Sequence, residues 1–258
     1  MLNKSWGFIG GGRITNIILG GFKRANKMPA EITVSDVDAD KLNKLQEKYP
    51  KITVTENNTQ SALMDLVFLA VHPPVVTKVL DEIKSSLKPD SILISLVPNF
   101  TIVKLEELLN GFKRILRIIP NAPSIVNSGF NPVTFADVFS EIEKKDLIDM
   151  LSILGKCPEV WEEELEAYAI LTAMGPAYFW FQWYELQEIG KSFGLNSKDI
   201  KEGMLQMLTG ALKVMFESDL TPQEVMDLLP VKPLGEDEES IKNIYKKKLE
   251  IMFKKLKS

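Results

Sequence analysis

The chain has very little of two residue types that carry much protein chemistry. Its 258 residues include one cysteine, Cys157, and one histidine, His72. A lone cysteine excludes an internal disulfide and agrees with a reducing compartment. We expect no metal site. We also expect no secretory signal peptide, because the first apolar run is short, broken by glycines and not followed by a small-residue cleavage site. The expected location is therefore the cytoplasm.

An excess of basic charge is also missing. Lysine and arginine total 31 and aspartate and glutamate 35, for a net charge of −4. Without a basic footprint, nucleic acid is not an expected partner. Charged residues make up 26% and hydrophobic residues 45% of the chain, both normal for a globular enzyme. We expect a small-molecule substrate.

A long uninterrupted apolar run is missing too. Tyr168–Leu186 comes nearest, but Gly175-Pro176 breaks it and it contains Gln182 and Glu185. No charged flanking pattern accompanies it, so we do not expect a membrane partner. A helix that is apolar on all sides is otherwise buried in a core or in a subunit interface. An intertwined homodimer or a higher homo-oligomer is the natural way to bury it.

A glycine turn follows the first apolar run. Gly7-Phe8-Ile9 leads into Gly10-Gly11-Gly12, and a helical pattern begins with Arg13 and Ile14. Gly10 would permit the tight turn and Gly12 the close approach of a pyrophosphate, which a helix N-terminus favours. Thr15 departs from the third glycine or alanine of the dinucleotide-binding fingerprint. The context favours a dinucleotide site over an ordinary strand-to-helix turn.

Strands and helices alternate up to about residue 160, and only helices follow. This alternation predicts an α/β fold, a Rossmann-type doubly wound parallel sheet over 1–162, followed by an all-helical domain over 163–258. The expected strands are Trp6–Ile9, Ile32–Ser35, Ile52–Val54, Leu66–Val71, Ile92–Leu96, Ile115–Ile119, Pro132–Phe135 and an edge strand Pro158–Trp161. The expected C-terminal helices are Leu165–Phe193, Ser197–Phe216, Pro222–Leu228 and Asp237–Leu256.

Asp36 closes the second strand, 24 residues after Gly12. An acid near this spacing hydrogen-bonds the adenosine ribose in dinucleotide folds and favours NAD over NADP, because it repels a 2′-phosphate. No arginine follows it, and Lys41 is the nearest cation in the sequence. The alternative is a helix N-cap, a role that Asp38 can fill instead.

Two further turns follow strands at the edge where ligands bind. Val71-His72-Pro73 follows the fourth strand, and His72 is either a proton donor or, as we favour, a loop residue that contacts the cofactor without doing chemistry. Pro120-Asn121-Ala122-Pro123 follows the sixth. Asn121 either reads the nicotinamide carboxamide or forms an Asx-turn, and the turn alone does not decide.

These turns carry a resemblance to the pyrroline-5-carboxylate reductase family over nearly the whole chain. The family has a similar glycine turn, a Val-Lys-Pro turn where this chain has Val71–Pro73, and a Met-Pro-Asn-Thr-Pro turn matched by Ile119–Pro123. Val126 and Gly129 follow in register. Its Ser-Gly-Ser-Gly-Pro-Ala-Tyr motif is matched by Thr172–Tyr178.

The resemblance implies a Rossmann domain, a helical domain that dimerises, NADP or NAD as cofactor, and reduction of the cyclic imino acid 1-pyrroline-5-carboxylate to proline. A protonated imine is already electrophilic, so hydride transfer needs chiefly proximity and orientation. Asn57 or Asn58 would lie near the adenosine. The expected cofactor-binding residues are Gly10, Gly11, Gly12, Arg13, Ile14, Asp36, Asn57, Val71, His72, Pro73 and Asn121. The expected substrate-binding residues are Thr172, Met174, Gly175, Pro176 and Lys232, with His72 and Thr172 as weak catalytic candidates.

The substrate side departs from the family pattern. Its Ser-Pro-Gly-Gly-Thr-Thr loop, which grips the substrate carboxylate, corresponds here to Leu229–Gly235, which has no serine, threonine or double glycine. Met174 replaces a serine, Phe181 a threonine, and Pro98-Asn99 an Ala-Gly turn. Lys232 would supply a point charge instead. Three hypotheses follow: an imino-acid reductase with an altered grip, a reductase of another imine or carbonyl substrate, or a non-catalytic dinucleotide-binding regulator.

Overall fold

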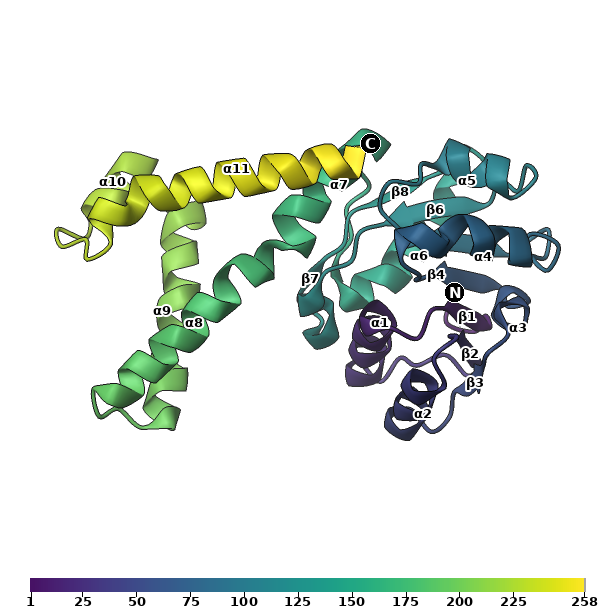
Figure 1. Cartoon of the computed structure of the whole chain (residues 1–258), viewed down its shortest axis with the longest axis horizontal. Coiled ribbons are helices and arrows are strands. Elements are labelled where there is room, and N and C mark those ends of the chain that lie inside the picture. Colours follow the sequence, from purple (N-terminus) through teal and green to yellow (C-terminus); the bar gives the residue numbers. More distant parts are fainter. Residues whose placement is uncertain (258) are drawn as a thin grey trace. The chain divides into compact units, whose positions relative to one another are not determined.

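The computed structural model describes residues 1–257 and divides into two compact units. The first comprises Met1–Met174 together with the end of the chain from Met252, and the second comprises Gly175–Ile251. In Figure 1, Met1–Met174 run from purple to teal and Gly175–Ile251 from green to yellow, and the yellow end of α11 from Met252 belongs to the first unit. The division falls after Met174, later than the boundary between residues 162 and 163 that the sequence predicts, because Leu165 and Ala169 pack with Ile119.

A seven-stranded sheet forms the centre of the first unit, in the order β3-β2-β1-β4-β5-β6-β8. The strands up to β6 pair in parallel, and β8 closes the sheet antiparallel to β6. This order is that of a doubly wound dinucleotide-binding sheet. The predicted Rossmann-type sheet and the helical C-terminal region are both confirmed. The strands are β1 (Trp6–Ile9), β2 (Ile32–Ser35), β3 (Thr53–Thr55), β4 (Leu66–Leu69), β5 (Ile92–Ser95), β6 (Ile115–Ile118) and β8 (Val133–Phe135).

The central strands are apolar and buried along their whole length, as strands covered on both faces must be. The rings of Phe8 on β1 and Phe68 on β4 stack at 4.4 Å, and Trp6 and Phe22 pack edge to face beside them. The connecting helices are α1 (Arg13–Arg24), α2 (Ala39–Lys48), α3 (Asn58–Ala62), α4 (Val76–Ile83), α5 (Ile102–Leu108) and α6 (Glu141–Leu151).

The edge strand predicted at Pro158–Trp161 does not form, and a separate two-stranded sheet lies outside the main sheet. It pairs β7 (Gly129–Phe130) with β9 (Gly155–Lys156). The predicted strand is wrong, because Glu159 makes only an isolated bridge to Val133. Pro158 lacks the N–H group that a regular ladder would use.

Helix α1 lies unusually close to the turn after β6. A Cβ on Gly21 would lie 2.5 Å from the carbonyl oxygen of Ser124, and one on Gly20 2.7 Å from Ile125. Asn127 also donates to the Gly21 carbonyl at 2.9 Å. Gly20 and Gly21 therefore allow α1 to pack closely against the turn after β6. This contact fixes the position of α1, the helix that follows the glycine turn.

The predicted helix Leu165–Phe193 is interrupted. It consists of α7 (Leu165–Tyr168), a π-helical segment (Ala169–Ala173) and α8 (Gly175–Ser192). Single π-helical turns are rare and occur frequently at functional sites. The interruption separates the first unit from the second.

Helices α8, α9 (Ser197–Glu217), α10 (Pro222–Asp227) and the first part of α11 (Glu238–Lys257) form the second unit. Tyr178 and Phe179 of α8 pack against Tyr245 of α11. Between Gly175 and Ile251, only Gly175 and Ile200 are buried. No helix within residues 1–257 is both long and apolar enough to cross a membrane.

Asp65, just before β4, is held by groups that favour its ionised form. Its carboxylate accepts hydrogen bonds from the N–H and hydroxyl of Ser5, both at 3.0 Å, and from the Lys88 ammonium at 3.1 Å. The Ser5 N–H chiefly, with help from Lys88, lowers the pKa of Asp65 from 3.8 to about 2. A carboxyl group with a lowered pKa stabilises the fold above its unfolded pKa and loses this effect as the pH falls.

Replacing Asp65 with asparagine should lower the free energy of unfolding by about 1 kcal/mol at neutral pH, after allowance for a side chain that is about a third exposed. Urea denaturation at several pH values measures the difference from the native chain, which should shrink between pH 3.8 and about 2. Asp81→Asn, at an exposed ion pair with Lys84, should change little. A difference at Asp65 that stays constant with pH would contradict this.

Candidate functional site

The carboxyl ends of β1 and β4 form the switch point of the sheet, where open α/β sheets bind ligands. Gly10 follows β1 with a φ of +107°, and a Cβ there would lie 2.5 Å from the carbonyl oxygen of Ala70. Only glycine fits this position. Thr15 is fully buried, and its hydroxyl donates to the Gly10 carbonyl. The departure from the fingerprint at Thr15 thus stabilises the turn.

The N-terminus of α1 is open to an anion. Gly12 is the N-cap and makes no side-chain capping bond, and no acidic residue lies in the first turn. A Cβ on Gly12 would have no atom within 4 Å. Open space in front of free helix N–H groups suits a pyrophosphate. These residues therefore fit a dinucleotide.

Asp36 lies beside this turn. Its Oδ2 accepts the Gly11 N–H at 2.8 Å and its Oδ1 accepts the Asp38 N–H at 3.0 Å. The N-cap of α2 is Asp38, whose side chain accepts the Lys41 N–H. The capping role considered for Asp36 is therefore filled by Asp38, and Asp36 lies at the strand end where dinucleotide-binding folds in general hold the adenosine ribose.

The two asparagines after β3 have structural bonds. Asn57 is the N-cap of α3 and accepts the Thr59 N–H at 3.0 Å. Asn58 is buried, accepts the Ser35 hydroxyl at 2.9 Å and donates to Glu82 at 2.8 Å. The Asp36 N–H donates to the carbonyl of Thr55, the last residue of β3. Asn57 and Asn58 follow Thr55 and therefore lie near Asp36. Asn57 is the more exposed of the two.

A cleft of about 320 Å³ in the first unit brings four turns and the π-helical segment together. Most of its wall is apolar, and Arg13 and His72 are the ionisable side chains in the described lining. The lining residues are Gly12, Arg13, Ile14, Ala70, Val71, His72, Pro73, Leu96, Pro98, Ile119, Pro120, Ala169, Ala173 and Met174. An apolar cleft with few polar groups, at a switch point, is the usual form of a small-molecule site.

Seven of the predicted cofactor or substrate residues therefore share this cleft, namely Gly12, Arg13, Ile14, Val71, His72, Pro73 and Met174. His72 is exposed, and its carbonyl accepts the Val75 N–H at 3.1 Å, beginning the short helix Pro73–Val75. Within residues 1–257, no group of three or more histidine, cysteine, aspartate and glutamate side chains is arranged to hold a metal ion.

Asn121 is used inside the fold. Its Nδ2 donates to the Thr172 carbonyl at 3.3 Å, and its Oδ1 accepts the Phe130 N–H at 3.1 Å. The side chain is buried, and its backbone N–H is taken by Asn131. This geometry favours the structural interpretation of Asn121 over direct contact with a nicotinamide. Asn121 ties the turn after β6 to the π-helical segment.

Thr172 lies in that segment, and its hydroxyl donates to the Tyr168 carbonyl at 2.8 Å. The hydroxyl oxygen keeps lone pairs for an external donor. Gly175 and Pro176 begin α8 in the second unit. Lys232, also in the second unit, is exposed, and its carbonyl accepts the Gly235 N–H at 3.0 Å in the turn before α11.

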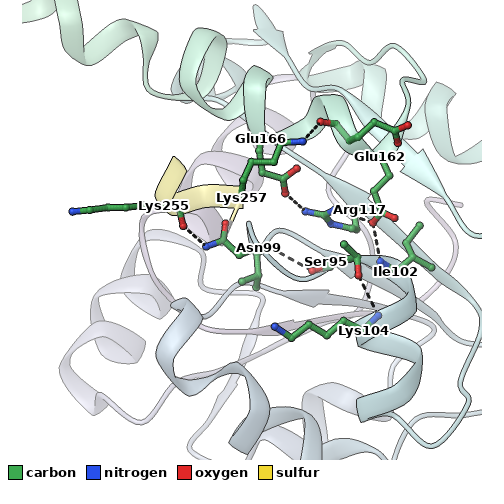
Figure 2. Close-up of polar contacts among 12 residues, drawn as sticks. Ser95, Asn99, Ile102, Lys104, Arg117, Glu162, Glu166, Lys255 and Lys257 are labelled. Carbon is green, nitrogen blue, oxygen red and sulfur yellow. Dashed lines mark hydrogen bonds and ion pairs between the residues drawn. The ribbon is translucent and has the colours of Figure 1, made fainter. Parts of the chain in front are cut away.

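A buried ion cluster, not predicted from the sequence, anchors α7, which leads directly into the π-helical segment. The guanidinium of Arg117, on β6, donates to Glu166 at 2.6 Å and to Glu162 at 2.8 Å. Figure 2 shows the three side chains, with Glu162 also accepting the Ile102 N–H at 2.7 Å. Arg117 is 1% exposed. The sequence signal was an arginine inside an otherwise apolar strand.

Asn99, in the turn after β5, also lies in this region (Figure 2). Its Nδ2 donates to the Lys255 carbonyl at 3.2 Å, near the end of α11. Lys257 donates to the Glu163 carbonyl at 2.8 Å. The C-terminal residues therefore brace the turn that carries Pro98, one wall of the cleft.

Comparison with known proteins agrees with this geometry. Residues 5–99 match the family described as NADP oxidoreductase, coenzyme F420-dependent. The pyrroline-5-carboxylate reductase of Corynebacterium melassecola is 28% identical over 220 residues, which cover 84% of this chain and 82% of that protein. The Escherichia coli pyrroline-5-carboxylate reductase is 25% identical over 229 residues, or 88% of this chain and 85% of that protein.

A solved structure is similar along the whole chain. The crystal structure of Plasmodium falciparum pyrroline carboxylate reductase, with NADP bound, has a TM-score of 0.83 and 25% identity, and the match covers 100% of this chain and 98% of that one. The resemblance to the pyrroline-5-carboxylate reductases that the sequence predicts is therefore confirmed.

Proposed function

We propose that this chain is an NAD(P)H-dependent oxidoreductase that reduces the C=N bond of a cyclic imino acid, 1-pyrroline-5-carboxylate, to form proline. The observation that carries the proposal is the cleft in which the open N-terminus of α1 meets the turn after β4 and the π-helical segment. The curated relatives that share most of the chain's length are named for this activity.

The cofactor half of the site is assigned to the glycine turn and its neighbours. Gly10 shapes the turn, and Gly11 and Gly12 with the first residues of α1, Arg13 and Ile14, would hold the pyrophosphate of NADP or NAD. Asp36 and Asn57 would lie toward the adenosine, and Val71, His72 and Pro73 would form the wall opposite the helix. Asn121 would act through the position of the turn after β6, since its side chain is bonded internally.

The substrate half is assigned to the start of the helical region. When bound, the reduced nicotinamide supplies a hydride. The chain's task is then to orient the imine and exclude water, which the apolar wall of Ile119, Ala173 and Met174 suits. Thr172 would offer its hydroxyl, and Gly175, Pro176 and Lys232 are further substrate-side candidates. His72, in the turn after β4, would contact the cofactor without donating a proton, because a protonated imine already carries the proton of the product amine.

Oxidation of NADH and NADPH by the purified chain, followed by absorbance with 1-pyrroline-5-carboxylate as substrate, tests the proposal. Turnover with either cofactor is expected. Absence of turnover with both cofactors would contradict it.

A second candidate is a reductase of a less acidic imine or a carbonyl compound. The observation that favours it is the exposed loop Leu229–Gly235, which lacks hydroxyl side chains, together with Met174 in the cleft wall. Turnover measured on a panel of imines and keto acids, compared with turnover of 1-pyrroline-5-carboxylate, distinguishes the two candidate functions. Dinucleotide binding without turnover on the whole panel would instead indicate a regulatory protein.

We further propose that the helical unit forms a homodimer. Phe181 is 68%, Phe193 80% and Phe216 73% exposed within the single chain. Large apolar side chains exposed to this degree are unfavourable in water, and a second copy of the same helices would cover them. A reducing compartment such as the cytoplasm suits the buried thiol Cys157, whose pKa burial raises to about 12.

Light scattering on the purified chain should therefore give at least twice the mass of one copy. Phe181→Asp and Phe193→Asp together should shift the mass to that of a monomer, because burying two carboxylates in an apolar interface is costly. Ile142→Asp, at a 76% exposed apolar residue of the first unit, is the matched control and should leave the assembly intact. A monomeric native chain would contradict the dimer.

A further inference from the structure

A second hollow of the first unit lies at the outer edge of the main sheet. β8 is the last strand on that side of the sheet (Figure 1). The end of β8, the start of α5 and the segment 159–164 line a groove of about 990 Å³, which we call the β8 groove. It shares no lining residue with the cleft assigned to the cofactor and substrate, so the proposed function makes no use of it.

The chain's own backbone covers only part of the outer side of β8. The Val133 N–H donates to the Pro158 carbonyl, and the Val133 carbonyl accepts the Val160 N–H, both at 2.9 Å. Backbone groups alternate along a strand, so the N–H and C=O of Phe135 face the same outer side. Within residues 1–257 these two groups have no hydrogen-bond partner, because the chain leaves the edge for the short helix Glu162–Glu164. An open strand edge of this kind can pair with another extended chain.

Exposed apolar side chains line the same groove. Trp161 is 76%, Val103 63% and Val138 44% exposed. The face of an indole ring attracts a guanidinium or ammonium group that lies within about 6 Å of it. The two valines suit the apolar side chains of an extended segment.

The β8 groove has an excess of negative charge. Its lining contains six carboxylates and two ammonium groups, from Glu106, Asp137, Glu159, Glu162–Glu164, Lys113 and Lys144. Lys144 is already paired with Glu159 at 2.8 Å, and Arg117 beneath the groove with Glu162 at 2.8 Å. Lys257 adds one cation beside Glu163. Carboxylates remain in excess with Arg117 and Lys257 included, so charge complementarity favours a basic partner.

We propose that the β8 groove is a docking surface for an extended, basic segment of another protein, which adds a strand to β8 at Phe135. The segment's backbone pairs with the open N–H and C=O of Phe135, an arginine or lysine lies on Trp161, and further basic side chains face Glu106 and Asp137. A small polycation would satisfy the carboxylates but leave the backbone groups of Phe135 unpaired. The open strand edge therefore favours a peptide segment.

Fluorescence anisotropy of a labelled heptapeptide of alternating valine and arginine, titrated with the full chain, tests the proposal. Its Kd should be at least about tenfold lower than that of the matched peptide of alternating valine and glutamate. A third peptide keeps the valine and arginine side chains but is methylated on every backbone nitrogen. It should bind about tenfold more weakly than the parent peptide, because it has no N–H group to pair with the strand edge.

Variants of the chain locate the peptide. Trp161→Ala should weaken binding of the arginine peptide by about five- to tenfold, and Asp137→Asn by about threefold. Ile142→Ala and Asp146→Asn are the matched controls, because they change an apolar and an acidic residue of α6 that do not line the groove. All four side chains are exposed, so none of these changes has to disturb the fold.

Equal affinity for the arginine and glutamate peptides, or binding of neither, would overturn the docking surface. If the methylated peptide binds as tightly as its parent and spermine displaces both, the groove is a site for small polycations and no strand is added. Equal effects of Trp161→Ala and Ile142→Ala would place the peptide outside the groove. The reductase assay with NADH and NADPH is independent of all these outcomes.

Discussion

Replacing Arg117 with methionine is expected to lower the free energy of unfolding by about 3–5 kcal/mol, because it leaves the carboxylates of Glu166 and Glu162 without their counter-ion. The loss is large because Arg117 and Glu166 are almost completely buried, at 1% and 8% exposure. Chemical denaturation of the native chain and of the variant measures it.

Arg114→Met is the matched control for this prediction. Arg114 also pairs with a glutamate at 2.8 Å, but both side chains are partly exposed, and we expect a loss of about 1 kcal/mol. Adding Glu166→Leu to Arg117→Met should recover part of the stability, since one stranded charge is removed. Equal effects at Arg117 and Arg114 would contradict the buried cluster as an anchor of α7.

Replacing Gly12 with aspartate is expected to weaken NADH and NADPH binding by about a hundredfold or more while the fold keeps its stability. The added side chain enters space with no atom within 4 Å, so nothing in the described chain has to move. Aspartate is also a favoured N-cap, which would raise the stability of α1 by a few tenths of a kcal/mol. Its carboxylate would occupy the place of the pyrophosphate.

Calorimetry and thermal unfolding on the same samples check both parts. Gly12→Asn provides the control, because it is a cap of similar size without charge and should lose less affinity. Gly10→Ala should behave in the opposite way, since its Cβ would collide with the Ala70 carbonyl and destabilise the fold itself. Undiminished binding by Gly12→Asp would mean that the dinucleotide does not lie at this helix.

The glycine turn and its neighbouring strands and helix were predictable because local rules govern them. A strand, a glycine turn and a helix N-terminus form from residues close in the sequence, and Asp36 follows at the spacing that the fold requires. The structure adds two contacts that spacing cannot predict: the hydrogen bond that the Gly11 N–H donates to Asp36, and the one that the Thr15 hydroxyl donates to the Gly10 carbonyl.

The partner of the Asn121 amide and the π-helical segment could not be predicted from the sequence. A turn with two prolines predicts a fixed asparagine, but whether its amide faces a ligand or the fold depends on Thr172, 51 residues away. The apolar pattern of 165–193 is typical of one continuous α-helix. No local sequence signal distinguishes the π-helical turn at Ala169–Ala173 from an ordinary α-helix, so this turn depends on tertiary contacts.

The helical unit illustrates a different limit. The apolar residues of α8 predict burial, and the single chain leaves Phe181 and Tyr184 about two-thirds exposed. Periodicity predicts that a face must be covered, and in the proposed dimer the covering surface would belong to a second copy of the chain. A substrate role for the loop around Lys232 stays a prediction, because no local sequence pattern in that loop defines a ligand.

Hydride transfer from a reduced dinucleotide to an imine carbon is the central claim of the proposed function. The most direct test is to incubate the chain with 1-pyrroline-5-carboxylate and, in separate reactions, NADH and NADPH dideuterated at the hydride-donating carbon, and to analyse the product by mass spectrometry. The proposed function predicts proline carrying one deuterium for each dinucleotide oxidised. Tight dinucleotide binding with no labelled proline would contradict it.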